Sequence, residues 1–265
     1  MCSSDLLMRL FETRFEVAPY GVILKPSHGR RILKNEPNSG FSPKAAYIFL
    51  KQLEEADFVV VNRVDQMSTA EVDELVQLIH DRHPDIPAIR MSARTGEGFE
   101  QLVDQLDQRG DFGRRILDLD YDVYAEGEAE LGWLNSSLQV TAADPFVLDD
   151  LLFDVVDWLR TALVAAKAEV AHLKSIGLAD GSHAVVNLVS NDSPTELSLA
   201  SDCQTRRANI IVNARVAIAP EELQRLVAKA LDSACAKIKA TQSDHQTQSF
   251  RPGRPIPTHR FTADD

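Results

Sequence analysis

The sequence predicts an α/β protein with two domains, a parallel sheet with crossover helices followed by an α+β domain. In the first part of the chain, short apolar runs alternate with amphipathic helical segments, which is the order of elements in a parallel sheet. In the second part, segments that read as strands lie before, between and after two long helical segments. A length of 265 residues is enough for two domains, each with its own core.

Composition excludes several classes of protein. With 44% hydrophobic and 26% charged residues, the chain is typical of soluble globular proteins. A formal net charge of −12 repels phosphate backbones and anionic lipid, so we expect neither nucleic acid nor membrane as a partner. There is no signal peptide and no apolar run long enough to span a bilayer, which predicts a cytoplasmic protein. Cys2, Cys203 and Cys235 lie far apart, which disfavours a disulfide framework or a zinc knuckle.

The first predicted elements lead to a buried strand. Residues 17–24 read as a strand, and Ser42-Pro43 is a favourable helix start, with a cap residue followed by proline. That helix carries an apolar face and leads to Phe58–Val61, a continuous apolar run. A run of this kind is typical of a parallel strand that is buried on both faces of its sheet.

A second β-α unit follows the apolar run. Ser68 and Glu71 have the spacing of a capping box, and they open a further amphipathic helix. Prolines end that helix before a strand at 88–91. Gly96-Glu97-Gly98 then turns the chain into a last helix, whose inward face is predicted to hold Phe99, Leu102, Val103 and Leu106.

Polar residues follow both strands of this β-α unit. Asn62 and Asp65 come directly after the Phe58 strand, at the sheet edge where open α/β sheets bind ligands. The carboxylate of Asp65 can accept two hydrogen bonds from N1 and N2 of guanine, whereas adenine would leave it unpaired. Asn62 either braces the loop or meets the purine edge. An Asn-x-x-Asp pattern after an apolar run is also found simply as a helix cap, so the second loop decides the interpretation.

That second loop is Ser92-Ala93-Arg94, whose backbone amides can meet the guanine O6. Asn-Lys-x-Asp followed by Ser-Ala-Lys is the base-recognition pair of P-loop GTPases, and this chain resembles it. Arg63 and Arg94 stand in the two lysine positions. The resemblance implies a guanine-binding set, which consists of Asn62, Arg63, Asp65, Ser92, Ala93 and Arg94.

Past residue 110 the composition changes. Residues 111–130 are acidic and low in helix signal, so they are predicted to be a linker between a first domain at 1–110 and a second at 131–250. In the second domain we expect a strand at 131–140, then a long helix from Asp144-Pro145, and later a helix from Pro220. The other expected strands are 183–189, 209–216 and an edge strand at 247–250, with 196–200 extending the hairpin. The order β-α-β-β-α-β is that of a ferredoxin-like sandwich, and residues 251–265 read as a proline-rich tail.

With the guanine loops placed, the chain resembles the CobW/HypB/UreG group of GTPases, and in particular the CobW-like members. Cys2-Ser3-Ser4-Asp5-Leu6 is similar to a Gly-Ser-Cys-Thr-Asp-Leu segment midway through that family's GTPase domain. Lys51–Asp57 is similar to the family's approach to its guanine loop. The resemblance implies a GTP-binding protein of the metallochaperone and cofactor-assembly class, the class that includes cobalamin synthesis.

The family's phosphate loop is missing from the sequence. No Gly-x-x-x-x-Gly-Lys-Ser/Thr occurs, nor does the Cys-x-Cys-Cys metal motif. The resemblance therefore implies the distal half of a P-loop GTPase-type sheet, truncated or split, which is unable to hydrolyse GTP alone. GTP is then the expected ligand, and Mg²⁺ is expected only if a phosphate-loop half is supplied. The metal cargo stays unspecified.

Several partners and one other function fit this interpretation. Expected partners are an N-terminal GTPase half in trans, a metalloenzyme client, or a second copy that pairs through an exposed sheet edge. If no partner covers that edge, residues 1–110 are expected to be less stable than residues 131–250. The alternative function is a non-catalytic interaction module that acts through its C-terminal domain. His80 and His83 are a minor metal candidate, although histidines at a helix end are also favoured by the dipole.

Overall fold

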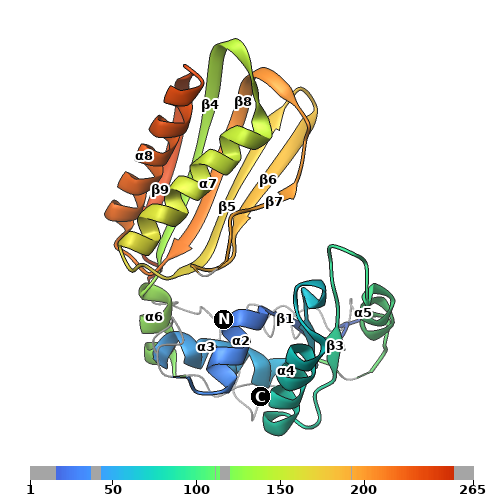
Figure 1. Ribbon diagram of the computed structural model, residues 1–265. Coiled ribbons are helices and arrows are strands. Elements are labelled where there is room, and N and C mark those ends of the chain that lie inside the picture. The colour runs from blue at the N-terminus through green and yellow to red at the C-terminus, as the bar shows by residue number, and fades with distance from the viewer. Residues whose placement is uncertain (1–15, 37–42, 111, 114–119, 192, 254–265) are drawn as a thin grey trace. The chain divides into compact units, whose positions relative to one another are not determined.

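The computed structural model describes residues 16–36, 43–110, 112–113, 120–191 and 193–253. The chain forms two compact units, and the boundary between them lies after Gly127 (Figure 1). Each unit has a sheet of its own. The first sheet is parallel with three strands, and the second has six strands, so the expected α/β architecture with one parallel sheet is present. The Cys2–Leu6 segment and residues 254–265 of the predicted tail lie outside the described residues.

The first sheet has the order β1-β2-β3, from β1 (Gly21–Leu24), β2 (Phe58–Val61) and β3 (Ala88–Arg90). Both neighbours run parallel to β2, with Ile23 opposite Val60 and Val60 opposite Ile89. All four residues of β2 are at most 1% exposed, as expected for a strand covered on both faces. The sequence placed the start of β1 four residues too early, because the strand covers only 21–24.

The helices of this unit are α2 (Pro26–Leu33), α3 (Pro43–Glu55), α4 (Thr69–Arg82) and α5 (Phe99–Leu106), with a 3₁₀ turn η1 at Val64–Gln66. The predicted capping box is present: the Ser68 side chain accepts a bond from the Glu71 amide, and the Glu71 side chain accepts one from the Ser68 amide. The sequence did not predict α2, whose eight residues give a short apolar pattern. In α5, Phe99, Val103 and Leu106 are exposed, and only Leu102 packs against the sheet.

The low helix content expected over 111–130 is wrong for part of that stretch, because Tyr121–Ala129 forms helix α6. Its first turn is capped by Asp120, whose Oδ1 accepts hydrogen bonds from the amides of Asp122 and Val123. An ion pair joins Glu126 to Lys44 of α3. Acidic residues suggested a solvated linker, but here an aspartate is the cap of a helix.

The second unit is a single antiparallel sheet with the strand order β7-β6-β5-β8-β4-β9. Helices α7 (Leu148–Ala165) and α8 (Pro220–Lys237) cover one face of it (Figure 1). They enclose a continuous apolar core with β4, β5, β6 and β8. The strands are β4 (Gly132–Val147), β5 (Val170–Ala179), β6 (Ser182–Leu188), β7 (Glu196–Leu199), β8 (Gln204–Val216) and β9 (Thr241–Phe250).

Three predictions for this unit need correction. Strand β5 was not predicted at all. Asp144-Pro145 does not start the long helix, because β4 continues to Val147 and only its register with β8 shifts, between Thr141 and Phe146. Proline is tolerated at such an irregularity, since it has no amide to give to the ladder. The edge strand β9 is ten residues long rather than the four predicted.

No helix in the described ranges is both long and apolar enough to cross a lipid bilayer.

A buried carboxylate ties the start of α7 to the loop before β8. Asp149 is 7% exposed, and its two oxygens accept hydrogen bonds from the amides of Ser201 and Asp202 and from the Ser201 hydroxyl. Burial raises the pKa of the Asp149 carboxyl, but these hydrogen bonds outweigh burial and hold the pKa below its ordinary value. The ionised form is therefore the one that the fold stabilises.

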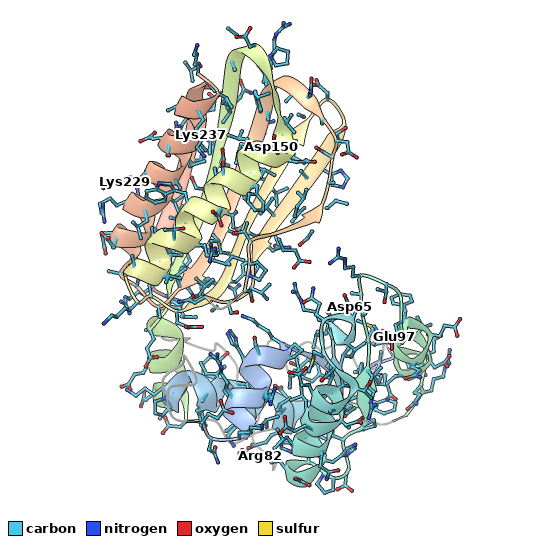
Figure 2. The ribbon with its side chains drawn as sticks, in the orientation of Figure 1. Asp65, Arg82, Glu97, Asp150, Lys229 and Lys237 are labelled. Carbon is cyan, nitrogen blue, oxygen red and sulfur yellow. The ribbon has the colours of Figure 1, made fainter. Side chains whose placement is uncertain are left out.

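We predict that Asp149→Ala lowers the free energy of unfolding by about 1 to 3 kcal/mol at neutral pH, because three donors lose their acceptor. The lowered pKa means that this stabilisation is complete above the ordinary carboxyl pKa and is lost as pH falls through the native pKa. Urea unfolding at several pH values measures it. Asp150→Ala is the matched control, since Asp150 is the next residue and is exposed (Figure 2); equal losses in both variants would refute the role of Asp149.

Candidate nucleotide-base site

Asn62 fastens together the two loops that follow β2 and β3. Its Oδ1 accepts hydrogen bonds from the Arg63 amide at 2.8 Å and from the Ala93 amide at 3.0 Å. The sequence left open whether Asn62 braces the loop or meets a purine edge, and the structure shows it bracing both loops. Because the two strands are neighbours in a parallel sheet, their carboxyl ends bring these loops together.

Backbone bonds fix the 3₁₀ turn that carries Asp65. The Met91 amide donates to the Val61 carbonyl at 2.9 Å, and the Val64 amide donates to the Met91 carbonyl at 3.2 Å. Arg63 adopts a left-handed conformation with φ of 69°, which costs a non-glycine residue on the order of 1 kcal/mol. The surrounding bonds hold the chain in this sharp turn directly after the strand.

Asp65 lies in the middle of this turn and is exposed, so its carboxylate is accessible to a ligand (Figure 2). The Arg63 side chain donates to Gln66 Oε1 at 3.3 Å. The turn therefore presents an acceptor with two oxygens on a rigid support, which is what recognition of two adjacent N–H groups requires.

The second loop is closed by its own hydrogen bonds. Ser92 is fully buried: its amide donates to the Glu97 carbonyl at 2.9 Å, its carbonyl accepts from Gly96 at 2.9 Å, and its hydroxyl accepts from the Thr95 amide at 3.2 Å. The predicted turn at 96–98 is present. A Cβ on Gly98 would lie 2.0 Å from the Arg90 carbonyl oxygen, so glycine is required for this close approach.

These hydrogen bonds show what the two loop amides already contact within the protein. The amides of Ser92 and Ala93 were expected to meet guanine O6, but both donate within the protein, to Glu97 and to Asn62. Ala93 and Arg94 are exposed, whereas Ser92 shapes the loop from inside. The structure thus brings the six predicted residues together at one edge of the sheet and divides them into two roles. Asp65, Arg63, Ala93 and Arg94 lie at the surface or half-buried, and Asn62 and Ser92 hold the loops.

The described residues include no group of three or more His, Cys, Asp or Glu side chains placed to hold a metal ion. His80 lies in the last turn of α4, and His83 is its C-cap residue. The backbone amide of His83 donates to the Ile79 carbonyl at 2.8 Å, which is an ordinary helix end.

Comparison with known proteins assigns no family. No family model matches the chain, and no curated protein matches it. Among solved structures, the chain is similar to Zn(II)-bound YjiA GTPase from E. coli, with 12% identity over 90% of this chain and 68% of that chain, at a TM-score of 0.23. A triple mutant of the same GTPase gives 12% identity over 88% and 66%, at a TM-score of 0.22. Superpositions at TM-scores this low establish no common fold.

We predict that Asn62→Ala increases hydrogen exchange at the Ala93 amide about fivefold, because a single hydrogen bond of about 1 kcal/mol is lost. Amide exchange followed by NMR measures the change residue by residue. Asn62→Asp is the matched control, since its carboxylate still accepts both bonds and should keep the protection. Unchanged exchange in Asn62→Ala would show that Asn62 does not hold the two loops together.

Proposed function

We propose that the first unit binds the guanine base of GTP or GDP at the edge formed by the loops after β2 and β3. The observation that carries this proposal is the bracing by Asn62, which supports both loops at once beside an accessible Asp65. A chance Asn-x-x-Asp sequence that only caps a helix would not require a bond to the second loop. Here the asparagine is used to join the two segments that base recognition needs.

Asp65 supplies the specificity in this proposal. Its carboxylate accepts the N1 and N2 protons of guanine, and adenine has no such pair of donors, so adenine would leave a desolvated carboxylate unpaired. Because the Ser92 and Ala93 amides already donate within the protein, guanine O6 is met by the Arg94 segment or shares the Ala93 amide. The planar guanidinium groups of Arg63 and Arg94 suit contact with the face of a purine.

The proposal extends to the CobW-like class of GTP-binding metallochaperone and cofactor-assembly proteins, acting in the cytoplasm. Transfer of a phosphoryl group needs a phosphate cradle, its lysine and Mg²⁺. The 265 residues contain no such motif, so in this proposal hydrolysis needs a phosphate-loop segment in addition to them. An unidentified metal cargo and a metalloenzyme client complete this proposal.

We further propose that the second unit is a ferredoxin-like sandwich with an added hairpin. Four of its strands have the order β9-β4-β8-β5, and two helices cover one face. That order supports a split β-α-β arrangement, in which β6 and β7 extend the sheet beyond β5.

We predict that the purified chain binds GTP and GDP with micromolar affinity, does not bind ATP at the same concentration, and loses guanine binding in Asp65→Ala. Loss of both carboxylate hydrogen bonds should weaken binding at least tenfold, because each charge-assisted bond contributes about 1.5 to 3 kcal/mol. Isothermal titration calorimetry with Mg²⁺ measures all three nucleotides.

The matched control is Asp104→Ala, which removes an exposed carboxylate from α5 of the same unit. It should bind as the wild type does. Equal affinity for GTP and ATP, or guanine binding that survives Asp65→Ala, would contradict the proposed base site.

A further inference from the structure

The face of the second sheet that α7 and α8 leave uncovered has a composition unlike the rest of the chain. On β4, β8, β5 and β6, every second residue points to this face, as strand geometry requires. No Asp or Glu occurs at these positions, although the chain has a net charge of −12. On the neighbouring strand β7, Glu196 is opposite Asn187 and lies at the edge of this face. We call this surface the open face; its residues are 133, 135, 137, 139 and 141 of β4, 207, 209, 211, 213 and 215 of β8, 172, 174, 176 and 178 of β5, and 183, 185 and 187 of β6.

Three basic side chains on the open face have no acidic partner among the described residues. Arg207 and Arg215 are exposed and Lys174 is half-buried, and none of the three forms an ion pair with a described carboxylate. By contrast, Lys237 on α8 pairs with Asp154 of α7 at 2.8 Å. Helices α7 and α8, which carry acidic residues such as Asp150, cover the other face of the sheet (Figure 2). On β4, β8, β5 and β6 the open face therefore carries basic side chains and no acidic one, although the chain as a whole has a net charge of −12.

An aromatic and guanidinium stack lies at one end of this surface. The Arg215 guanidinium lies 3.8 Å from the centre of the Trp133 ring, and the ring of Phe250 on β9 is 6.1 Å from that of Trp133. Strand register places Phe250, Trp133, Arg215 and His172 in one row across four strands. The exposed side of a stacked guanidinium plane is a platform on which a further planar group can lie.

Amide side chains fill the next rows. Asn135, Asn213, Lys174 and Asn187 are cross-strand neighbours, and Gln139 donates to Asn209 Oδ1 at 3.4 Å in a parallel row. Each amide offers both donors and an acceptor. Carboxylates of an acidic peptide need donors only, whereas nucleobase edges present both donors and acceptors, so this mixture fits bases better than an acidic chain.

We propose that the open face binds single-stranded nucleic acid. Lys174, Arg207 and Arg215 neutralise phosphates, unpaired bases stack on the Arg215 and Trp133 platform, and the amides contact base edges. An antiparallel sheet that presents aromatic and basic residues can bind splayed bases by stacking and by phosphate contacts. The net charge of −12 led us to expect no nucleic acid as a partner, and this proposal departs from that expectation because Lys174, Arg207 and Arg215 lie together on one face.

The test is fluorescence anisotropy with the full chain and a labelled RNA of about 12 nucleotides, with the matching single-stranded DNA as a second probe. Arg215→Ala should weaken binding about tenfold by removing the stacking platform. Lys174→Gln leaves the Trp133 platform intact and removes one phosphate contact. For three phosphate contacts, the slope of log affinity against log salt should be near −2 in the wild type, and the variant should reduce its magnitude by about 0.7. Lys229→Ala, an exposed lysine on α8, is the matched control and should change neither affinity nor slope by as much.

Circular dichroism of each variant checks that the fold is retained. Preference for RNA or DNA identifies which single strand the face takes, and either result supports the proposal. No binding by the wild type, binding that the two open-face variants do not weaken, or equally tight binding of duplex RNA would overturn it. The proposal would also be overturned if polyglutamate displaced the labelled RNA as effectively as unlabelled RNA does, because the face would then be a site for acidic protein segments.

Discussion

The burial of β2 on both faces is the constraint on which the first unit depends. Phe58, Val59, Val60 and Val61 are all essentially inaccessible to solvent, and the strand pairs with both β1 and β3. A strand whose four side chains are all buried is typical of the centre of a parallel sheet that is covered on both faces. Once it is there, its carboxyl end is fixed beside that of β3, and the residues that follow each strand meet at one edge.

The proximity of the loops after β2 and β3 brings residues that are distant in sequence into one candidate site. Asn62 uses a single oxygen to accept from both loops, and Ser92 is buried to close the second loop around Thr95 and Glu97. Two of the six predicted residues thus act by holding backbone in place. The exposed Asp65 depends on this support, because an acceptor discriminates between bases only if it cannot move to suit the wrong one.

The sequence predicted those features that depend on local patterns. The β2 apolar run, the Ser68 and Glu71 capping box and the turn at Gly98 were all readable, since each depends on neighbours within a few residues. Strand β5 was missed, and the start of α7 was placed at Pro145, because β4 continues through an irregularity that only its partner β8 reveals. Within the site, the sequence predicted the two loops that follow β2 and β3. It could not predict that the Ser92 and Ala93 amides donate within the protein, because residue spacing does not show hydrogen bonds between distant segments.

Charge shows the same contrast between sequence and structure. Composition gave a single number, −12, which describes the chain as a uniform anion. In the six-stranded sheet, the acidic side chains of α7 and α8 lie on the helix-covered side, and Lys174, Arg207 and Arg215 lie on the open face without an ion-pair partner among the described residues. The alternation of residues along β4, β5 and β8 shows which side chains share a face. Only the strand register shows that Trp133, Arg215 and His172 form one row.

The central claim is that Asp65 reads a guanine base through its two acceptor oxygens. The most direct measurement is calorimetric binding of guanosine and xanthosine triphosphates to the wild type and to Asp65→Asn. Xanthine has a carbonyl where guanine has its amino group, so an amide at position 65 can donate where the carboxylate accepted. The account predicts that the wild type prefers guanosine and the variant prefers xanthosine triphosphate. Unchanged preference in Asp65→Asn would contradict it, because the base would then be recognised elsewhere or not at all.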